Sequence, residues 1–123
     1  MPGKSTIMET TQRYCLTLEL VDDPEIIGEY KYWHRQENIW PQIPEGIKAI
    51  GIKNMEIYCL ENRLFMIIDA GPDFNFEADM ARLAELPRQS EWETFVSRFQ
   101  KADQNATSAQ KWKLMEKIFG LHG

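Results

Sequence analysis

The sequence predicts a single α+β domain in which strands alternate with amphipathic helices. Two kinds of pattern support this class: apolar runs of strand length bounded by turn residues, and longer segments whose apolar residues recur every three or four positions. The 123 residues are enough for one hydrophobic core, and no repeat or low-complexity tract indicates a second domain. We expect a flexible leader over residues 1–12 and one domain over residues 13–121.

The first strand is predicted over residues 13–20, where side chains alternate between two faces. One face would carry Tyr14, Leu16, Leu18 and Leu20, and the other Cys15, Thr17 and Glu19. A helix should follow, with Asp23 as N-cap and Pro24 at its first position, where the missing N–H has no cost. Its inner stripe would be Ile26, Ile27, Tyr30, Trp33 and His34. A shorter second helix is predicted after Pro41 and Pro44, which interrupt the first.

A hairpin is predicted next, from residues 54–60 and 64–70 joined by the short loop 61–63. Asn62 is the loop residue that tolerates a positive φ. On the first hairpin strand, Met55, Ile57 and Cys59 share one face, and Asn54, Glu56 and Tyr58 share the other. An amphipathic helix then ends before Pro87, and its apolar positions are Phe76, Met80, Leu83 and Ala84.

The last third of the chain predicts one more helix and one more strand. Ser90 and Glu93 have the spacing of a capping box, and the stripe that follows is Trp92, Phe95, Val96 and Phe99. Residues 101–110 are polar and are predicted to form a loop, whereas residues 113–121 are predicted to form a closing strand. The resulting βαββαβ order is that of ferredoxin-like domains.

Charge and composition bound the partners and the compartment. The net charge of −5 does not provide the excess of positive charge that binding to a nucleic-acid backbone needs. No apolar run reaches the roughly 20 residues that span a bilayer. The N-terminus lacks the apolar core of a secretory signal, and two distant cysteines, Cys15 and Cys59, fit a reduced cytoplasmic setting. Helices on one side of a small sheet would leave its other face uncovered, although that face also carries apolar residues. We therefore expect a homodimer.

His34 is the natural candidate for proton chemistry near neutral pH. The only other histidine, His122, is next to last in the chain. On residue type alone, His34 and Tyr30 fit equally well as packed residues of an aromatic helix. One histidine near Glu37 does not supply the three or four ligands of a metal site, and we expect no metal. No glycine-rich nucleotide loop or nucleophile elbow is present, so we expect no cofactor.

The ordered set of landmarks along the chain resembles the L-rhamnose mutarotase family. The landmarks are Tyr30-x-x-x-His34, Ile39-Trp40-Pro41, Gly51-Ile-Lys-Asn54 leading into a strand, and Trp92 opening a late helix. The resemblance runs from about Arg13 to Leu121. It implies a dimeric ferredoxin-like protein, a dimeric α+β barrel, that interconverts the α and β anomers of deoxy sugars.

The resemblance also assigns roles to individual residues. It makes His34 the proton donor, and it makes Tyr30, Asn54, Met55, Trp92 and Glu93 contacts of a monosaccharide. Met55 stands where the family has an aromatic residue, and Trp92-Glu93 stands where it has a tryptophan pair. The segment from His34 to Trp40 is two residues longer than in the family. By resemblance the substrate is a 6-deoxy-L-hexose, with L-rhamnose the first choice and L-fucose the second.

Mutarotation requires only positioned proton transfer, which typically contributes about 10²–10⁴-fold per group. The sequence leaves the partner of His34 open between a bound water, Glu56 and Asp69. It also leaves open two other functions of the same architecture: a small oxygenase acting on aromatic compounds, and a non-catalytic module that binds a sugar or another metabolite.

Overall fold

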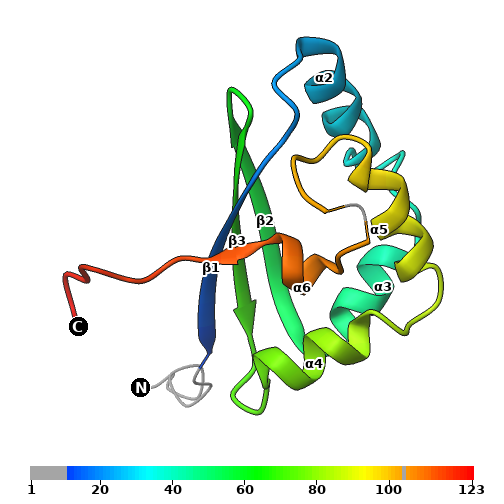
Figure 1. Cartoon of the computed structure of the whole chain (residues 1–123). Coiled ribbons are helices and arrows are strands. Elements are labelled where there is room, and N and C mark those ends of the chain that lie inside the picture. Colours follow the sequence, from blue (N-terminus) through cyan, green and yellow to red (C-terminus); the bar gives the residue numbers. More distant parts are fainter. Residues whose placement is uncertain (1–10, 104) are drawn as a thin grey trace.

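The computed structural model describes residues 11–103 and 105–123, and it confirms the α+β class and the ferredoxin-like order (Figure 1). The strands and helices follow the chain as β1 (Gln12–Glu19), α2 (Pro24–Trp33), α3 (Gln42–Ala49), β2 (Ile52–Leu60), β3 (Arg63–Ala70), α4 (Phe76–Leu83), α5 (Gln89–Ser97), α6 (Ser108–Lys111) and β4 (Lys113–Leu114). The antiparallel sheet has the order β2-β3-β1-β4.

The helices lie on one side of the sheet, and the core fills the space between the two layers (Figure 1). Alternation along the central strands decides which side chains enter this core. The predicted inner face of β1 is confirmed, because Leu16, Leu18 and Leu20 are at most 5% exposed. Residues of β3 pair with them in register, and the buried members are Leu64, Met66 and Ile68. We call this the inner face of the sheet, and the opposite side the outer face.

The start of α2 is built as its sequence predicts. Oδ1 of Asp23 accepts hydrogen bonds from the backbone N–H groups of Glu25, at 2.8 Å, and Ile26, at 3.4 Å. Pro24 occupies the first helical position. Such a cap contributes about 1 kcal/mol, and it fixes where the helix begins and hence which residues face the sheet. Tyr30 is buried on that side, six residues into the helix.

The sequence placed Gln12 in the leader, but the structure places it in the first strand. Residues 1–10 lie outside the described part of the chain, but Gln12 is already the first residue of β1. Its side-chain amide donates to the carbonyl groups of Gly71, Pro72 and Phe74 at 2.8–3.1 Å. Gln12 therefore belongs to the folded domain, where it fastens the first strand to the turn after β3.

Two predictions of local chemistry are wrong, both near α5. The capping box at Ser90 and Glu93 does not form, because the helix begins earlier, at Gln89, after Arg88 turns the chain with a φ of 67°. A capping box forms instead at Thr107 and Gln110, within the stretch predicted to be a loop, and it starts the short helix α6. The strong polarity of residues 101–110 concealed this turn of helix.

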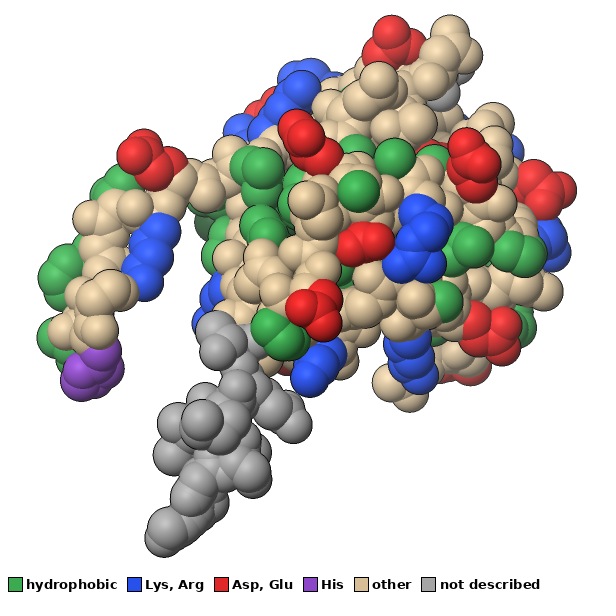
Figure 2. Space-filling model, turned by 90° about the horizontal axis from the view of Figure 1, so that it is seen from below, with side chains coloured by type: hydrophobic (Ala, Val, Ile, Leu, Met, Phe, Trp, Pro, Cys, Tyr) green, Lys and Arg blue, Asp and Glu red, His purple; other side chains and the backbone are tan. Residues whose placement is uncertain are grey.

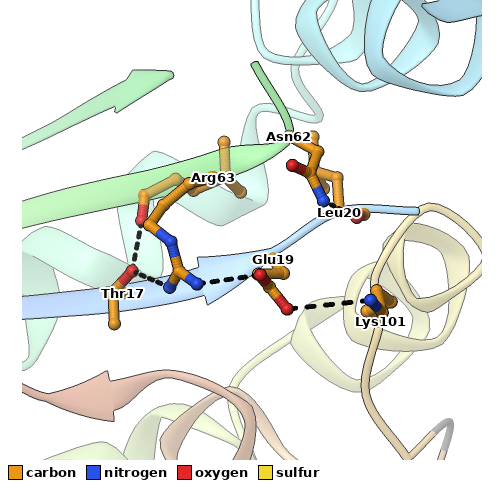
Figure 3. Close-up of polar contacts among 7 residues, drawn as sticks. Thr17, Glu19, Leu20, Asn62, Arg63 and Lys101 are labelled. Atoms are coloured by element: carbon orange, nitrogen blue, oxygen red, sulfur yellow. Dashed lines mark hydrogen bonds and ion pairs between the residues drawn. The ribbon is translucent and has the colours of Figure 1, made fainter. Parts of the chain in front are cut away.

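The hairpin between β2 and β3 has the predicted position, but a different residue makes the turn. Glu61, and not Asn62, adopts the positive φ, at 55°. Asn62 instead forms two hydrogen bonds with Leu20: its side-chain amide donates to the carbonyl at 3.0 Å, and its carbonyl accepts from the N–H at 2.7 Å (Figure 3). This clamp ties the hairpin to the end of β1.

The outer face carries ion pairs that run from strand to strand. Arg63 donates to Thr17 and to Glu19, and Lys101 approaches Glu19 at 3.9 Å (Figure 3). Asp69 forms a second pair, with Arg13 on the neighbouring strand. These groups are mostly exposed to solvent, which screens their charges, so the pairs contribute little to stability. They give the outer face charged side chains.

The closing strand is much shorter than predicted. β4 covers only Lys113–Leu114, extended by one further bond from the N–H of Met115 to the carbonyl of Cys15. The remaining residues leave the domain as a segment that stands apart from its body (Figure 2). We call residues 115–123 the C-terminal arm. Its apolar side chains are strongly exposed, and they include Ile118 (89%), Phe119 (77%) and Leu121 (79%). Among the described residues, no helix is long and apolar enough to cross a membrane.

Candidate functional site

A cavity of about 550 Å³ lies between the helices and the inner face of the sheet. This size is typical of small-ligand sites. Most of its wall is apolar and comes from the strands and from α3, with Leu16, Ile43, Ile57, Met66 and Ile68 among the lining residues. The polar groups come mainly from the helical side, with Tyr30, His34, Gln89 and Gln100. Among the described lining residues there is no carboxylate.

His34 enters the cavity because it caps the C-terminal end of α2. Its backbone N–H bonds to the carbonyl of Lys31, and its Nδ1 lies 2.7 Å from the carbonyl oxygen of Tyr30, one turn earlier. A carbonyl can only accept, so Nδ1 carries the proton in this contact. Nε2 is therefore the nitrogen that a ligand in the cavity can reach, and the neutral ring offers a lone pair there.

Burial lowers the pKa of His34, although the hydrogen bond to the Tyr30 carbonyl acts in the opposite direction. Desolvation disfavours the imidazolium form, whereas the carbonyl favours it. The larger of the two effects is burial, so the resting form near neutral pH is the neutral imidazole. The lowered pKa differs from that of the unperturbed histidine that the sequence alone would suggest. A neutral resting imidazole suits a group that first takes up a proton and then returns it.

Tyr30 forms the floor under the histidine. The two rings stack with centroids 4.0 Å apart and an interplanar angle of 27°. Burial strongly raises the pKa of the Tyr30 hydroxyl, and a hydrogen bond from the Gln100 side chain only partly opposes this effect. The phenol therefore stays protonated across the physiological range. It can donate a hydrogen bond but cannot act as a base.

Trp92 closes the other side of the histidine. Its ring meets the His34 ring edge-on, with centroids 5.3 Å apart, and it meets the Trp40 ring at 5.2 Å. The Arg88 guanidinium lies over Trp40, 4.3 Å from the ring centroid. Trp92 is only 5% exposed and lines the cavity. The fold thus brings together the sequence landmarks His34, Trp40 and Trp92, although they are far apart in sequence.

Met55 and Asn54 border the cavity from β2. A bulge between Ile52 and Asn54 shifts the pairing with β3, so that Asn54 stands opposite Asp69 and Met55 stands opposite Ile68. One extra residue reverses the alternation of a strand. Met55 therefore faces the cavity and is half-buried, whereas the exposed Asn54 side chain lies near Glu56, at 3.4 Å. Only Met55 of this pair directs its side chain to the inner face.

Glu93 does not line the cavity, although its side chain is buried. Its carboxylate accepts one hydrogen bond from Nε2 of Gln89, at 2.8 Å, and another from the N–H of Ser108, at 3.1 Å. The ammonium group of Lys111 binds the Glu93 carbonyl at 3.0 Å, and burial lowers the pKa of that lysine. Glu93 therefore joins α5 to α6, a role that differs from both the capping and the sugar contact expected of it.

The two carboxylates considered as partners of His34 lie on the outer face. Asp69 is paired with Arg13, and Glu56 accepts a hydrogen bond from the Tyr58 hydroxyl at 2.9 Å. Both side chains belong to the face opposite the cavity, because residues 56 and 69 alternate with the inward Ile57 and Ile68. Neither is placed to exchange a proton with a group bound beside His34.

Sequence reasoning missed the two buried amides of the cavity, Gln89 and Gln100. They are 4% and 6% exposed, and no hydrogen-bond partner is present for the Oε1 atom of either among the described residues. A signal was available, because Gln89, Trp92 and Val96 are three and four residues apart and share one side of α5. Within the described part of the chain, no group of three or more His, Cys, Asp or Glu residues could hold a metal ion.

Comparisons with known proteins identify the family of the chain. A model of the L-rhamnose mutarotase family matches residues 13–121. An L-fucose mutarotase of Xanthomonas campestris pv. campestris is 37% identical over 110 residues, which cover 89% of this chain and 88% of that protein. A UPF0734 protein of Dictyostelium discoideum is 35% identical over 112 residues, 88% of each chain.

A solved structure supports the fold. The crystal structure of an L-rhamnose mutarotase from Formosa agariphila superposes with a TM-score of 0.67 at 18% identity, covering 89% of this chain and 98% of that one. The family model spans most of the chain, and one named relative passes one-third identity over nearly its whole length. The chain therefore belongs to the L-rhamnose mutarotase family, a family of isomerases that interconvert sugar anomers.

Proposed function

We propose that the cavity binds a 6-deoxy-L-hexose and that His34 moves the proton that opens and recloses its ring. The observation that carries the proposal is the placement of His34: its Nδ1 is held by the Tyr30 carbonyl, and its ring forms part of the wall of a largely apolar cavity. The family name supports L-rhamnose, and the name of one relative supports L-fucose. Both sugars are 6-deoxy-L-hexoses.

The proton moves in two half-reactions. In ring opening, Nε2 of neutral His34 takes the proton of the anomeric hydroxyl, while the ring oxygen gains a proton and the bond from C1 to the ring oxygen breaks. The open aldehyde rotates about the bond between C1 and C2. In ring closure, the hydroxyl oxygen formed from the ring oxygen attacks C1 and gives its proton back to the group that supplied it, while the imidazolium returns its proton to the carbonyl oxygen of the aldehyde. The same residue therefore acts as base and then as acid, as microscopic reversibility requires.

The other residues bind and orient the sugar. We assign to the protonated Tyr30 hydroxyl a hydrogen bond to a sugar oxygen, because its raised pKa leaves it a donor throughout. Trp92 and Met55 supply apolar surface for the C6 methyl and the apolar face of the ring. A bound water is the proposed proton partner at the ring oxygen, since Glu56 and Asp69 lie on the outer face.

The test is the rate of anomer exchange, measured by magnetisation-transfer NMR on L-rhamnose, L-fucose and other aldoses. We expect the protein to accelerate exchange above the spontaneous rate for at least one of the two 6-deoxy-L-hexoses. An aldose that carries a hydroxyl at C6 should respond less, because that hydroxyl would meet the apolar wall. Unchanged exchange across the panel would disprove the proposal.

We also propose that two copies of the chain pair through the outer face of the sheet and the C-terminal arm. The outer face carries half-buried Phe65 and Ile67, and the exposed Tyr58 and Leu60 continue it. The arm adds three strongly exposed apolar side chains. The opposite charges cancel within each of the pairs Arg13–Asp69 and Arg63–Glu19, so two such faces can meet without like-charge repulsion.

The dimer is tested by sedimentation equilibrium of the full chain and of a variant that ends at Leu114. The full chain should sediment at twice its 14.4 kDa mass, and the shortened chain should dissociate at higher concentration. A full chain that stays monomeric at high micromolar concentration would exclude the pairing, without bearing on the cavity.

A further inference from the structure

We propose that Gln89 and Gln100 bind the sugar, each accepting a hydrogen bond from a different hydroxyl group, and that Glu93 positions Gln89 for this contact. The inference rests on the proposed function, because it concerns the same cavity and the same class of substrate. None of the landmarks that define the family resemblance includes either glutamine.

The two glutamines stand at opposite ends of one stripe of cavity-lining residues. The stripe is Gln89, Trp92, Val96 and Gln100, with spacings of three, four and four residues. Such spacing keeps the first three on one side of α5, which ends at Ser97, whereas Gln100 lies beyond the helix in a β-bridge with Leu20. In chain order, these side chains bring an amide, an indole, an isopropyl group and a second amide to the cavity wall. Because the amides are at opposite ends, they reach different parts of one ligand.

The orientation of the Gln89 amide is fixed by its partner. A carboxylate only accepts, so the Gln89 atom 2.8 Å from Glu93 must be Nε2, and Oε1 is turned away from Glu93. Glu93 is itself held by the N–H of Ser108 and cannot rotate freely. The clamp between α5 and α6 therefore presents a carbonyl oxygen, and not an N–H group, on the cavity side of Gln89.

Gln100 is placed beside the reacting end of the site. Its side chain acts on the Tyr30 hydroxyl in the direction of a donor, because the interaction lowers the pKa of the phenol against the larger effect of burial. Gln100 lines the same cavity as Tyr30 and His34, it is 6% exposed, and its Oε1 has no hydrogen-bond partner among the described residues. Tyr30 stacks on His34, so the Tyr30 ring links Gln100 to the proton-transfer group.

A buried carbonyl oxygen without a donor is costly, and native proteins rarely leave one unmatched. Two such oxygens in one cavity call for a ligand that brings hydrogen-bond donors into an apolar space. The hydroxyl groups of a monosaccharide meet this need. In the free protein, water serves the same purpose and is released when the sugar binds.

The experiment compares Gln89→Met and Gln100→Met with a matched control, Gln42→Met. Methionine keeps the length of the side chain and removes the amide. Gln42 also has a buried Oε1 without a hydrogen-bond partner, but it does not line the cavity. KM and kcat are measured by anomer exchange, Kd by ligand-observed NMR, and folding by thermal unfolding, all on the full chain.

We expect each cavity variant to raise KM and Kd by about two- to ten-fold, the range of one neutral hydrogen bond, with kcat and its pH profile little changed. The control should leave KM unchanged. Analogues of the sugar that lack a single hydroxyl add an independent test, because the wild-type protein should bind two of them more weakly. An analogue that lacks the hydroxyl bound by one glutamine should bind the methionine variant of that glutamine as strongly as it binds the wild-type protein.

Glu93→Gln tests the positioning role. The Ser108 N–H keeps the remaining carbonyl oxygen, so the new amide NH₂ faces Gln89 and forces the Gln89 amide to turn over. KM should rise as in Gln89→Met, and the double variant should raise it no further than Gln89→Met alone. A purely structural Glu93 would lower the melting temperature and leave the KM of the folded protein unchanged.

The outcomes separate the two proposals. If the wild-type protein exchanges the sugar but both methionine variants keep KM and Kd within two-fold, the oxygens hold only water and this inference is wrong. If a variant fails to fold, the single-deoxy analogues on the wild-type protein decide the same question, because equal affinity for all of them would contradict the contacts. If the wild-type protein neither binds nor exchanges any sugar of the panel, the proposed function fails first.

Discussion

The two faces of the sheet handle polarity in opposite ways. On the outer face, carboxylates and guanidinium groups pair in the open, as Arg13 does with Asp69 and Arg63 with Glu19. The inner face and its helices border a cavity whose described lining contains no carboxylate, and the polar groups beside His34 and Tyr30 include the amides of Gln89 and Gln100. Along β2 and β3, neighbouring residues point to opposite faces of the sheet, so a single step along the strand leads from the charged outer face to the cavity side.

This contrast shows why the nearest acids in the sequence are not the chemical groups of the site. Glu56 and Asp69 neighbour cavity residues along the chain, yet their side chains point to solvent. Inside the cavity, burial favours neutral forms: it lowers the pKa of His34 and raises that of Tyr30. Proton exchange by a neutral imidazole therefore fits the inner face, and charge pairing fits the outer one.

The largest effect is expected from His34→Asn. Asparagine can still donate to the Tyr30 carbonyl, so the end of α2 is kept while the reachable nitrogen is lost. We predict that kcat for anomer exchange falls by about 10²–10⁴-fold, the usual contribution of a proton-transfer group. His122→Asn, in the C-terminal arm, serves as the control and should keep full activity. Retained activity in His34→Asn would remove the histidine from the mechanism.

The second effect is on the pH profile. Because the pKa of His34 is lowered, the neutral form persists below pH 6.5. We predict a constant kcat/KM above neutrality and a decline of about tenfold per pH unit below the pKa of His34, after correction for spontaneous exchange. The same sign applies to stability: the contribution of neutral His34 is complete above the unfolded pKa of about 6.5 and is lost as the pH falls from there through the lower pKa of the folded state. A rate that rises on acidification would contradict the neutral resting form.

A smaller effect is expected from Tyr30→Phe. The substitution removes the hydroxyl and keeps the ring that stacks on His34. We predict a change in kcat/KM of about ten-fold, the value of one hydrogen bond in an enclosed site. Tyr32→Phe on the exposed side of the same helix is the matched control. Equal activity of the two variants would show that the Tyr30 hydroxyl does not contact the sugar.

The smallest effect is expected on the outer face. Glu56→Gln and Asp69→Asn should leave kcat and KM within about two-fold, and each should change the free energy of unfolding by less than about 1 kcal/mol, as for other exposed ion pairs. Chemical denaturation checks the second value. A loss of turnover in either variant would mean that the carboxylate reaches the site and would remove the distinction between the two faces.

Much of this fold could be predicted because its signals are local. The alternation of residues 13–20 and the Asp23-Pro24 start of α2 depend on neighbouring residues only, and both are confirmed. The start of α5 was missed because the positive φ of Arg88 has no signature in the side chain. The closing strand was predicted too long, since apolar residues of the C-terminal arm resemble those of a strand but pair with no strand among the described residues.

The site divides in the same way. Tyr30, His34 and Trp92 could be named from order and spacing, and the structure brings their rings together. Gln89 and Gln100 could not be named, because a buried amide looks like any surface glutamine until its hydrogen-bond partners are known. Glu93 shows the reverse case, a residue assigned to the ligand whose carboxylate is occupied by the protein itself.

The central claim is that His34 rests as a neutral imidazole with Nε2 open to the sugar. It is tested most directly by two-dimensional ¹⁵N NMR of the imidazole rings, titrated with pH and with the 6-deoxy-L-hexose that is exchanged fastest. We predict the tautomer protonated at Nδ1, a pKa below 6.5 and a shift of the Nε2 signal when the sugar binds. A ring protonated at Nε2, or an Nε2 signal that saturating sugar leaves unmoved, would contradict the claim.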